Sequence, residues 1–496
     1  MHRPLSAITG KTLFRIILVI FWAALLGALL KRDYFIETLN LRETRVIQRG
    51  REESFLGIYF QNERIGYVKN RLSPAEGDRI ALVEDAYLRL NILGEVHPVH
   101  MQVRAELGRD LLLKNFTFQL TSPFYRMTAQ GTVQGRNVLF RLDTGKEVIN
   151  DTIQLAAPPF LSTNQRGYLL SKKLQPGDKL KIPYFDPVSL SGQDTVIEYQ
   201  GRAKVLIHGR VHNLHRFTET FSGLHFDSWL DDEGKVMKEE SPAGFVFLSE
   251  PEFKATDIPG TGKEILGAVS VPVTGRMPDP NGLVQIRYRL TLPADATFDL
   301  ARDRQSLTSD LLTVSLEPVP GPAAAACAEQ PAALATTPYI QANNEMIASQ
   351  ARKITQAETS AIGKVRSLAA WVYANLEKRP VLGIPDALTT LHTRMGDCNE
   401  HAVLFAALAR SADIPTRVAA GVVFFKNAFY YHAWNEVCID GRWLSLDTTR
   451  NQIPADVSHI KFVDGESAEM VRIGALLGRL QIEVLTASPA EWERKQ

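Results

Sequence analysis

A proline-rich segment divides the chain into two parts with different hydrophobic periodicities. Residues 318–338 hold five prolines and eight alanines, and proline at that density prevents a helix and favours an extended spacer. Before the segment, apolar residues recur mainly at every second position, whereas after it they recur at every third or fourth position. We therefore expect a linker at residues 317–338 between two differently folded parts, with Cys327 exposed and outside any regular structure.

The composition is that of a folded protein of two or three domains. Hydrophobic residues make up 45% and charged residues 22% of the 496 residues, which excludes a chain that is disordered throughout. The 56 basic and 55 acidic residues leave a net charge of +1. We expect no nucleic-acid partner, because such a partner needs a clear basic excess. Three cysteines are too few for a disulfide scaffold or a four-thiolate zinc site, and their odd number leaves at least one thiol unpaired.

Near the N-terminus, residues 16–30 form an uncharged apolar run. The run is shorter than the roughly 20 residues of a membrane span, but residues 12–14 extend it if Arg15 snorkels to the lipid headgroups. A cleaved signal peptide and a buried helix are the alternatives, although no small-residue cleavage site follows the run. We expect residues 1–32 to form a cytoplasmic tail and an uncleaved transmembrane helix.

The basic residues around this run give two readings of its orientation. Three Lys or Arg precede the core of the run and five follow it, up to Arg49, which by the positive-inside rule keeps the bulk of the chain in the cytoplasm. A short N-terminal tail before a signal anchor usually stays inside, which favours export instead. We expect a single-pass membrane protein of the cell envelope, with the bulk of the chain periplasmic or otherwise extracytoplasmic.

Residues 33–316 are rich in short segments with strand character. Residues 79–83, 115–120, 137–142 and 284–290 alternate or are rich in β-forming residues, and turn signals such as Gly-Asp separate them. We expect an all-β antiparallel region of one or two subdomains, with an envelope component as a partner. A lipid or glycan carrier is a further reading of this region, and it would need a deep apolar groove.

Three histidines lie close together in this β-rich region. Strand alternation places His208 and His212 on one face and His215 on the other, unless Gly209 forms a turn. A solvated strand face is a simpler interpretation of these residues than a metal site.

After the linker, helical spacing appears first and strands follow. Apolar residues at 365, 368, 369, 372 and 376 form one helical stripe, and residues 402–409 are apolar all round, as in a helix at the centre of a domain. Strands are expected at residues 416–425, 430–439, 442–447, 460–463 and 480–485. We therefore expect an α+β domain at residues 339–486 and a tail at residues 487–496.

Cys398 stands at the predicted start of the central helix. Asp397 suits the N-cap position and Glu400 falls at the third helical position, which together form a capping box. Unpaired backbone N–H groups in the first turn stabilise a thiolate, but Asp397 partly opposes that effect, so a reactive thiol here needs a base.

A predicted hairpin brings His432 and Asp447 together. Asp440-Gly441 favours a two-residue type I′ turn. That turn pairs Ile439 with Arg442 and, further along, places Asp447 opposite residue 434. His432 then lies on the same face as Asp447, at a diagonal and within reach of a hydrogen bond. A carboxylate in that position orients an imidazole and stabilises its cationic form, as nucleophilic catalysis requires.

Residues 387–450 resemble the core of the transglutaminase-like superfamily, whose members have a papain-like Cys-His-Asp fold. The matching pieces lie in family order and at family-like spacing, and they are Gly396-Asp397-Cys398, Glu400-His401-Ala402, Ile414-Pro415-Thr416-Arg417-Val418, His432-Ala433-Trp434 with Glu436-Val437, and Gly441-x-Trp443. One departure is at the acid, where Asp447-Thr448-Thr449 stands in place of the family's frequent Asp-Pro-Thr.

The resemblance implies a role for each of three residues. Cys398 would be the nucleophile, His432 the general base and acid, and Asp447 the group that orients the imidazole. The implied chemistry is acyl transfer on an amide or peptide bond of a protein or peptide substrate, with hydrolysis favoured over cross-linking. It requires neither a metal nor an organic cofactor.

Several plainer readings stay open at this point. Cys398 could be a buried structural thiol, and His401, three residues later, could form half of a zinc site with it. His432 and Cys438 could not both complete that site, because six strand residues, or roughly 20 Å, separate them. The whole chain could also be a non-catalytic envelope scaffold or binding protein with a vestigial Cys-His-Asp domain.

Overall fold

The structure is a computed structural model of the chain. It describes residues 37–38 and 52–489 apart from short internal gaps at 78, 93, 124, 146–147, 162–168, 171, 188–189, 222–223, 259–263, 265–269, 295, 319–326 and 328–330. The expected membrane segment at residues 16–30 lies outside the described residues. Within the described part, no helix is both long and apolar enough to cross a membrane.

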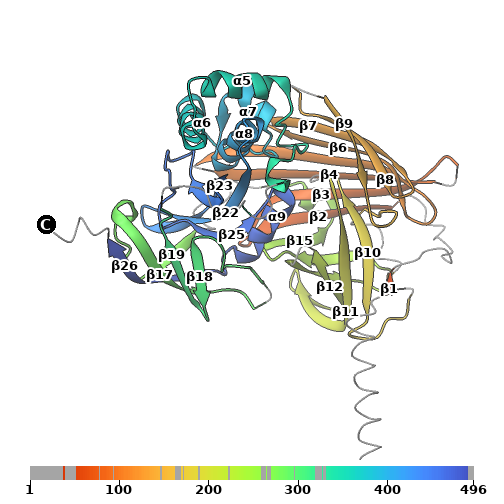
Figure 1. Cartoon of the computed structure of the whole chain (residues 1–496). Helices are drawn as coiled ribbons and strands as arrows, with labels where there is room; N and C mark the ends of the chain where they lie inside the picture. Colours follow the sequence, from red (N-terminus) through yellow and green to blue (C-terminus); the bar gives the residue numbers. More distant parts are fainter. Residues whose placement is uncertain are drawn as a thin grey trace, which may run out of the picture.

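The first half of the chain forms one large sheet, which confirms the all-β antiparallel region. In the described residues this sheet has 15 strands in the order β1-β10-β11-β12-β13-β14-β15-β2-β3-β4-β5-β6-β7-β8-β9, and every pairing is antiparallel except that of β1 with β10 (Figure 1). The strands are β1 (Glu37–Thr38), β2 (Glu52–Phe60), β3 (Glu63–Ala75), β4 (Arg79–Ile92), β5 (Glu95–Leu107), β6 (Leu113–Ser122), β7 (Tyr125–Gln134), β8 (Asn137–Asp143), β9 (Val148–Gln154), β10 (Lys179–Asp186), β11 (Ser191–Ile207), β12 (Arg210–Phe221), β13 (Leu224–Leu230), β14 (Val236–Glu240) and β15 (Phe245–Glu250).

Strand alternation builds the core of this sheet. In β8, Val138, Phe140 and Leu142 are buried, while the residues between them are exposed. Buried side chains of β5, β6 and β7 join them in one apolar cluster. The period of two read from the sequence therefore corresponds to one buried and one solvated face.

A second sheet combines strands from both sides of the proline-rich segment. Its order is β18-β19-β17-β26-β16-β23-β22-β25, with β24 paired to β23. The strands are β16 (Val271–Thr274), β17 (Leu283–Thr291), β18 (Gln305–Thr308), β19 (Leu311–Ser315), β22 (Thr416–Phe425), β23 (Ala428–Ile439), β24 (Arg442–Leu446), β25 (Ile460–Asp464) and β26 (Gln481–Pro489). The pairing thus groups residues 271–315 with the C-terminal part, whereas the sequence predicts the division at 316. The difference arises because β26 pairs with β16 and β17. No local sequence pattern predicts this pairing.

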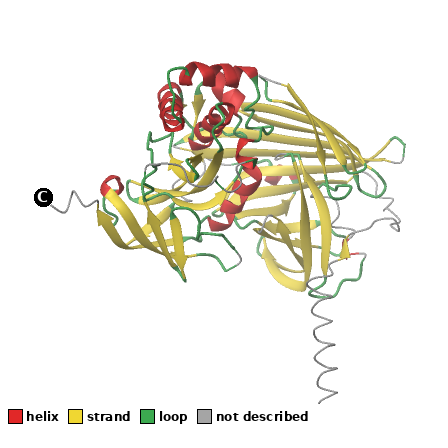
Figure 2. Cartoon of the chain, in the orientation of Figure 1, coloured by secondary structure: helices red, strands yellow, loops and turns green. Residues whose placement is uncertain are grey.

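Four helices cover the C-terminal strands at one end of the molecule (Figures 1 and 2). They are α5 (Glu345–Thr355), α6 (Ala361–Asn375), α7 (Ala387–Thr393) and α8 (Cys398–Ser411). Residues 400–410 of α8 are all buried, which confirms the central helix predicted from its apolar sequence. Short helices elsewhere are α3 (Glu252–Ala255), α9 (Ser467–Met470), η1 (Pro280–Gly282), η2 (Ala332–Leu334) and η3 (Val471–Leu476), and β20 (Glu377–Lys378) pairs with β21 (Met395–Gly396).

The helical layer packs directly on the large sheet. Ile384, from the segment before α7, belongs to the same buried cluster as Tyr125 of β7, and an added Cβ on Gly383 would lie 2.3 Å from the Tyr125 ring. Gly383 therefore allows a close approach that a larger residue would prevent. The two parts of the chain are in contact close to the start of α8.

The expectation for Cys327 is wrong. Its side chain is only 8% exposed, and its sulfur forms a disulfide with Cys438 of β23. Composition predicted an extended spacer, but the disulfide holds this residue against the C-terminal sheet. Cys398 is the free cysteine of the chain.

Candidate active site

Cys398 is the first residue of α8, where the sequence predicts it. The Asp397 carboxylate accepts a hydrogen bond from the Asn399 N–H at 2.8 Å, and the Glu400 carboxylate accepts one from the Asp397 N–H at 2.9 Å. The predicted capping box is thereby confirmed. The Cys398 side chain is half-buried and packs against the apolar core beneath α8.

The surroundings of Cys398 work against ionisation of the thiol. Burial and the neighbouring Asp397 carboxylate raise the pKa of Cys398 well above its usual value, and the Ala433 backbone opposes them by hydrogen bonding to the sulfur. Glu400 is also buried, and burial together with the Asp397 charge raises its pKa. The helix N-terminus alone therefore does not produce a thiolate, and a base is needed.

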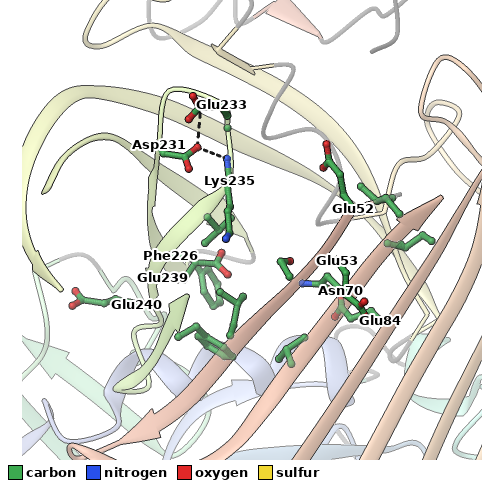
Figure 3. Close-up of a pocket in the computed structure, with 18 of the residues that line it drawn as sticks. Glu52, Glu53, Asn70, Glu84, Phe226, Asp231, Glu233, Lys235, Glu239 and Glu240 are labelled. Carbon is green, nitrogen blue, oxygen red and sulfur yellow. Dashed lines mark hydrogen bonds between the residues drawn. The ribbon is translucent and has the colours of Figure 1, made fainter. Parts of the chain in front are cut away.

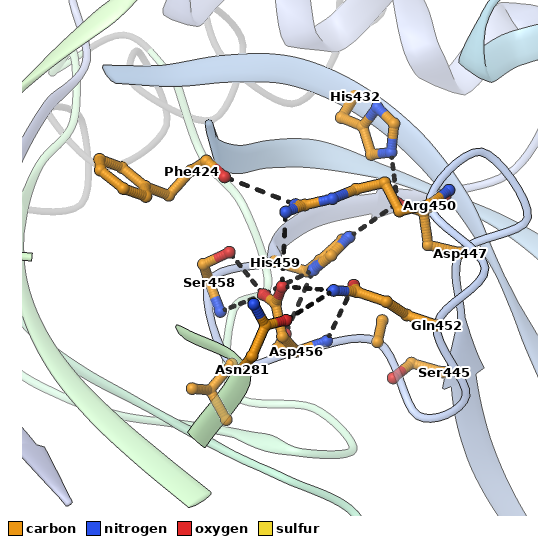
Figure 4. A network of polar contacts seen from close by, with 12 residues as sticks. Asn281, Phe424, His432, Ser445, Asp447, Arg450, Gln452, Asp456, Ser458 and His459 are labelled. Carbon is orange, nitrogen blue, oxygen red and sulfur yellow. Dashed lines mark hydrogen bonds and ion pairs between the residues drawn. The ribbon is translucent and has the colours of Figure 1, made fainter. Parts of the chain in front are cut away.

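His432 and Asp447 form the hydrogen bond predicted from the hairpin. The pair Ile439–Arg442 has the predicted register, and Asp440 and Gly441 have φ of 49° and 75°, as a type I′ turn requires. His432 Nε2 lies 2.9 Å from Asp447 Oδ2 (Figure 4). With Nε2 committed to the carboxylate, Nδ1 is the nitrogen that can exchange a proton with another group.

Strand β23, which carries His432, is fastened to the helix that carries Cys398. Asn435 of β23 donates a side-chain hydrogen bond of 2.9 Å to the Ala402 carbonyl of α8, and Ala433 and Val437 lie in the same core cluster as the inner face of α8. The Ala433 backbone is also near enough to the Cys398 sulfur to lower the pKa of the thiol, so the thiol lies close to the residue that follows His432. The three residues singled out in the sequence thus gather at one place.

His459 is a fourth polar member of this group, which the sequence analysis did not find. It lies one residue before β25 and is fully buried. Its Nε2 lies 3.1 Å from Asp447 Oδ2, the same oxygen that binds His432, and its Nδ1 lies 3.1 Å from Asp456 Oδ1 (Figure 4). The available signal was an Asp and a His three residues apart, directly before a predicted strand.

Asp447 is held as a carboxylate by this arrangement. Burial opposes its ionisation, but the His432 and His459 rings outweigh that effect and hold the pKa of Asp447 well below its usual range. Its second oxygen accepts the backbone N–H groups of Thr449 at 2.8 Å and Arg450 at 3.2 Å. Burial likewise opposes a charge on His459, yet Asp447 and Asp456 raise its pKa above the usual value.

These residues form a hydrogen-bonded set. Within the described part of the chain, the ligand atoms of His432, Asp447 and His459 come within 4.8 Å of one another, a spacing that a metal ion could also use. The shared Asp447 oxygen already binds both rings, so the distances are explained without an ion. The other zinc site considered from the sequence would start from Cys398 and His401. Cys438 cannot add a ligand to it, because the Cys438 sulfur is in the disulfide.

His401 is buried beside the site but turned toward the backbone. Its Nδ1 lies 2.7 Å from the Asp397 carbonyl, and burial lowers its pKa. Trp434 is buried beside both imidazole rings, with its centroid 6.3 Å from that of His432 and 5.2 Å from that of His459. It therefore forms part of the wall that fixes the two imidazoles.

A separate cavity of about 970 Å³ lies in the β-rich region between β2–β4 and β13–β15 (Figure 3). Leu56, Val68, Leu82 and Phe226 are among its apolar lining residues. Seven acidic residues also line it, against one lysine, Lys235. This is a mixed polar cavity and not the deep apolar groove that a lipid carrier would need.

The C-terminal part is an α+β domain with a cysteine at a helix terminus, a histidine on β23 and its partner Asp447 directly after β24. Residues 348–448 match the family model of the transglutaminase-like superfamily, and Cys398, His432 and Asp447 all lie inside that range. The chain therefore contains a transglutaminase-like domain. No curated protein matches the chain.

Solved structures show distant similarity. A candidate cysteine protease from Cytophaga hutchinsonii is 20% identical over 42% of this chain and 86% of its own, with a TM-score of 0.27. A β-barrel-like protein of a domain of unknown function from Brucella abortus is 10% identical over 41% of this chain and 96% of its own, with a TM-score of 0.33. A candidate protease from Parabacteroides distasonis is 10% identical over 67% and 68%, with a TM-score of 0.19.

Proposed function

We propose that this chain is a membrane-anchored cysteine enzyme that breaks amide or peptide bonds in a protein or peptide substrate. The observation that carries the proposal is the hydrogen bond of 2.9 Å between His432 and Asp447. The residue after His432, Ala433, lies next to the Cys398 sulfur. A nucleophile, a base and an orienting acid are the minimum set for acyl transfer through a thioester.

In the first half of the reaction, His432 Nδ1 takes the Cys398 proton as the sulfur attacks the substrate carbonyl carbon. The tetrahedral oxyanion needs a hydrogen-bond donor, and the Cys398 backbone N–H at the open helix end is suited to that role. The imidazolium then gives its proton to the leaving amine while the C–N bond breaks, which leaves a thioester. The raised pKa of Cys398 makes this transfer to His432 essential.

In the second half, His432 takes a proton from water and the resulting hydroxide attacks the thioester carbonyl. The carboxylic acid leaves, and the proton returns to the sulfur. A primary amine in place of water would give a cross-linked amide. We favour water, and we place the bulk of the chain outside the cytoplasm on an anchor formed by residues 16–30.

The proposal is tested by amide cleavage with the full chain. A casein digest assay detects new amino groups, and a primary-amine probe added in parallel detects transfer. We expect the parent to cleave the substrate, and Cys398→Ala and His432→Ala to have lost this cleavage. Cys398→Ser serves as the control for folding. Cleavage that persists in Cys398→Ala would overturn the proposed nucleophile, and amine incorporation in place of cleavage would indicate cross-linking.

A non-catalytic scaffold is the second candidate, and the raised pKa of Cys398 favours it. Such a protein would keep the buried thiol as a packing group and would bind an envelope component through the β-rich region. It predicts that Cys398→Ala folds normally and leaves partner binding intact. Cells that produce this variant should have the same phenotype as cells that produce the parent protein. A loss of the phenotype in a folded Cys398→Ala protein would exclude it.

A further inference from the structure

The three most exposed large apolar side chains of the described residues gather in one place. Phe253 is 78% exposed, Val211 is 68% exposed and Leu206 is 65% exposed. Leu206 and Val211 face each other across the β11–β12 hairpin. Phe253 directly precedes Lys254 in α3, whose Nζ lies 3.0 Å from the His208 ring at the hairpin turn.

Strand alternation turns the outer face of this hairpin toward solvent. His208 and Gly209 have φ of 49° and 78°, so the turn is a tight two-residue one. Ile207 and Leu214 are buried on the inner face against Trp229. Leu206 and its cross-strand partner consequently point away from the core, where nothing in the fold requires an apolar residue.

Cations lie close to the exposed apolar pair. Lys204 precedes Leu206 by two residues and shares its face, whereas Arg210 follows the turn opposite Ile207, on the other face of the hairpin. Both are exposed to solvent. Arg202, one step further from the tip, is paired with Asp232. Apolar side chains flanked by lysine and arginine match the interface of a bilayer that contains anionic lipids.

The sheet register places this tip at the end of the sheet where the first described strand, β1, begins. Glu37 of β1 pairs with Leu180 near the start of β10, and β1 runs parallel to β10. Strand β1 therefore starts on the side on which β10 begins. Strand β11 is antiparallel to β10, with Glu198 opposite Lys179, so its continuation toward Ile207 extends to that same side.

We propose that the β11–β12 tip, through Leu206, Val211 and the cations beside them, rests on the anionic lipid surface of the membrane that holds residues 16–30. This inference rests on the anchor in the proposed function but not on its chemistry. The tip is a second contact with the bilayer, and it fixes how the β-rich region is tilted over the lipid surface.

The test places an environment-sensitive fluorophore at the tip of the full chain. Leu206→Cys is labelled with nitrobenzoxadiazole in a Cys398→Ala background and reconstituted into vesicles of phosphatidylcholine and phosphatidylglycerol. Flotation reports the anchor, and quenching by doxyl-labelled lipid reports contact at the tip. Val211→Cys provides a second position, and Phe425→Cys, 51% exposed beside the turn after β22, is the matched control.

We expect the chain to float and both tip labels to shift to the blue and be quenched, with the control label unaffected. The shift should be smaller in phosphatidylcholine alone. A chain that floats with both tip labels unquenched would overturn the tip contact and leave the anchor intact. A chain that does not float would overturn the anchor and the tip contact together, and because Cys398 is absent, neither result depends on catalysis.

Discussion

At the scale of single residues, the unusual feature is one carboxylate oxygen shared by two imidazoles. Asp447 Oδ2 accepts from His432 and from His459, and Asp456 holds the far side of the His459 ring. A cationic His459 would lock Asp447 in its ionised form and in one orientation. His459 is therefore a positioning residue for the His432–Asp447 pair.

Replacement of His459 by Asn should lower stability most at mildly acidic pH. The folded pKa of His459 is raised above its unfolded value, so its contribution is fully present below about pH 6.5 and is lost as pH rises through the folded pKa. We expect a loss of roughly 3 kcal/mol near pH 6 that shrinks at higher pH. Urea unfolding at several pH values measures it.

The matched control is His100→Asn, at a side chain that is 54% exposed. This variant should follow the parent at every pH. A His459→Asn loss that stays constant from pH 5 to 9 would show that the ring is a neutral packing group.

Asp397 should tune the reactivity of Cys398. Its charge raises the pKa of the thiol, while its side-chain oxygen caps the helix. Asp397→Asn keeps an oxygen acceptor for the cap and removes the charge, so the alkylation profile should move to lower pH.

Iodoacetamide labelling followed by mass spectrometry measures that profile, and without a reductant only Cys398 is a free thiol. Asp440→Asn at the type I′ turn is the control, because Asn also accepts a positive φ. An unchanged profile in Asp397→Asn would contradict the electrostatic role.

The sequence allowed the His432–Asp447 contact to be predicted, but not the second imidazole. The first contact depends on one local turn, Asp440-Gly441, which fixes the register of a hairpin. His459 reaches Asp447 only because β25 pairs with β22, and that pairing joins segments about 40 residues apart that no single turn connects. Local signals do not specify such a neighbour.

At the scale of elements, Gly421 sets the spacing of the strands beneath the site. It pairs with His432 of β23 on one side and with Lys461 of β25 on the other. A Cβ at this position would lie 1.9 Å from the Ile460 carbonyl oxygen. Only glycine permits so close an approach of β25 and thus of the neighbouring His459.

Gly421→Ala should displace β25 and disturb the site. We expect a loss of about 1–3 kcal/mol in unfolding free energy from overpacking, together with a fall in any amide cleavage. Chemical denaturation and the cleavage assay measure the two effects. Gly474→Ala, whose added Cβ would have no neighbour nearer than 4.0 Å, is the control, and equal stability of the two variants would contradict the role of Gly421.

At the scale of the whole molecule, the C-terminal domain depends on residues before the proline-rich segment. Arg304, in the β17–β18 connection, donates to the carbonyls of Ala455 at 2.6 Å, Asp456 at 2.8 Å and His459 at 3.1 Å. Its side chain is nearly buried and pairs with Glu317. The loop that presents His459 is therefore held from outside the predicted catalytic region.

A fragment of residues 339–496 should fail to fold cooperatively, whereas residues 270–496 should fold. The shorter fragment lacks β16–β19, so β26 loses both neighbours and the core around Phe429 and Ile460 loses the side chains of Ile286, Tyr288 and Leu312. Near-ultraviolet circular dichroism during thermal unfolding distinguishes the two. Identical cooperative transitions would contradict this account.

Composition and periodicity predicted the two kinds of fold but not where they meet. The all-β region and the helices at residues 361–375 and 398–411 follow from local patterns. The proline-rich segment looked like a boundary because prolines break elements, yet Cys327 within it is bonded to β23. Disulfide partners and pairings between distant strands belong to the tertiary structure, and a local sequence pattern does not predict them.

The position of β26 in the middle of its sheet has a consequence for biosynthesis. It lies between β17 and β16, which leave the ribosome some 200 residues earlier, while the large N-terminal sheet pairs almost wholly with itself. Domains tend to fold in the order of synthesis, so the first sheet can form while the second still waits for its central strand. The nascent chain would thus carry a finished scaffold and an unassembled thiol site, and the site would come together only after β26 has been synthesised.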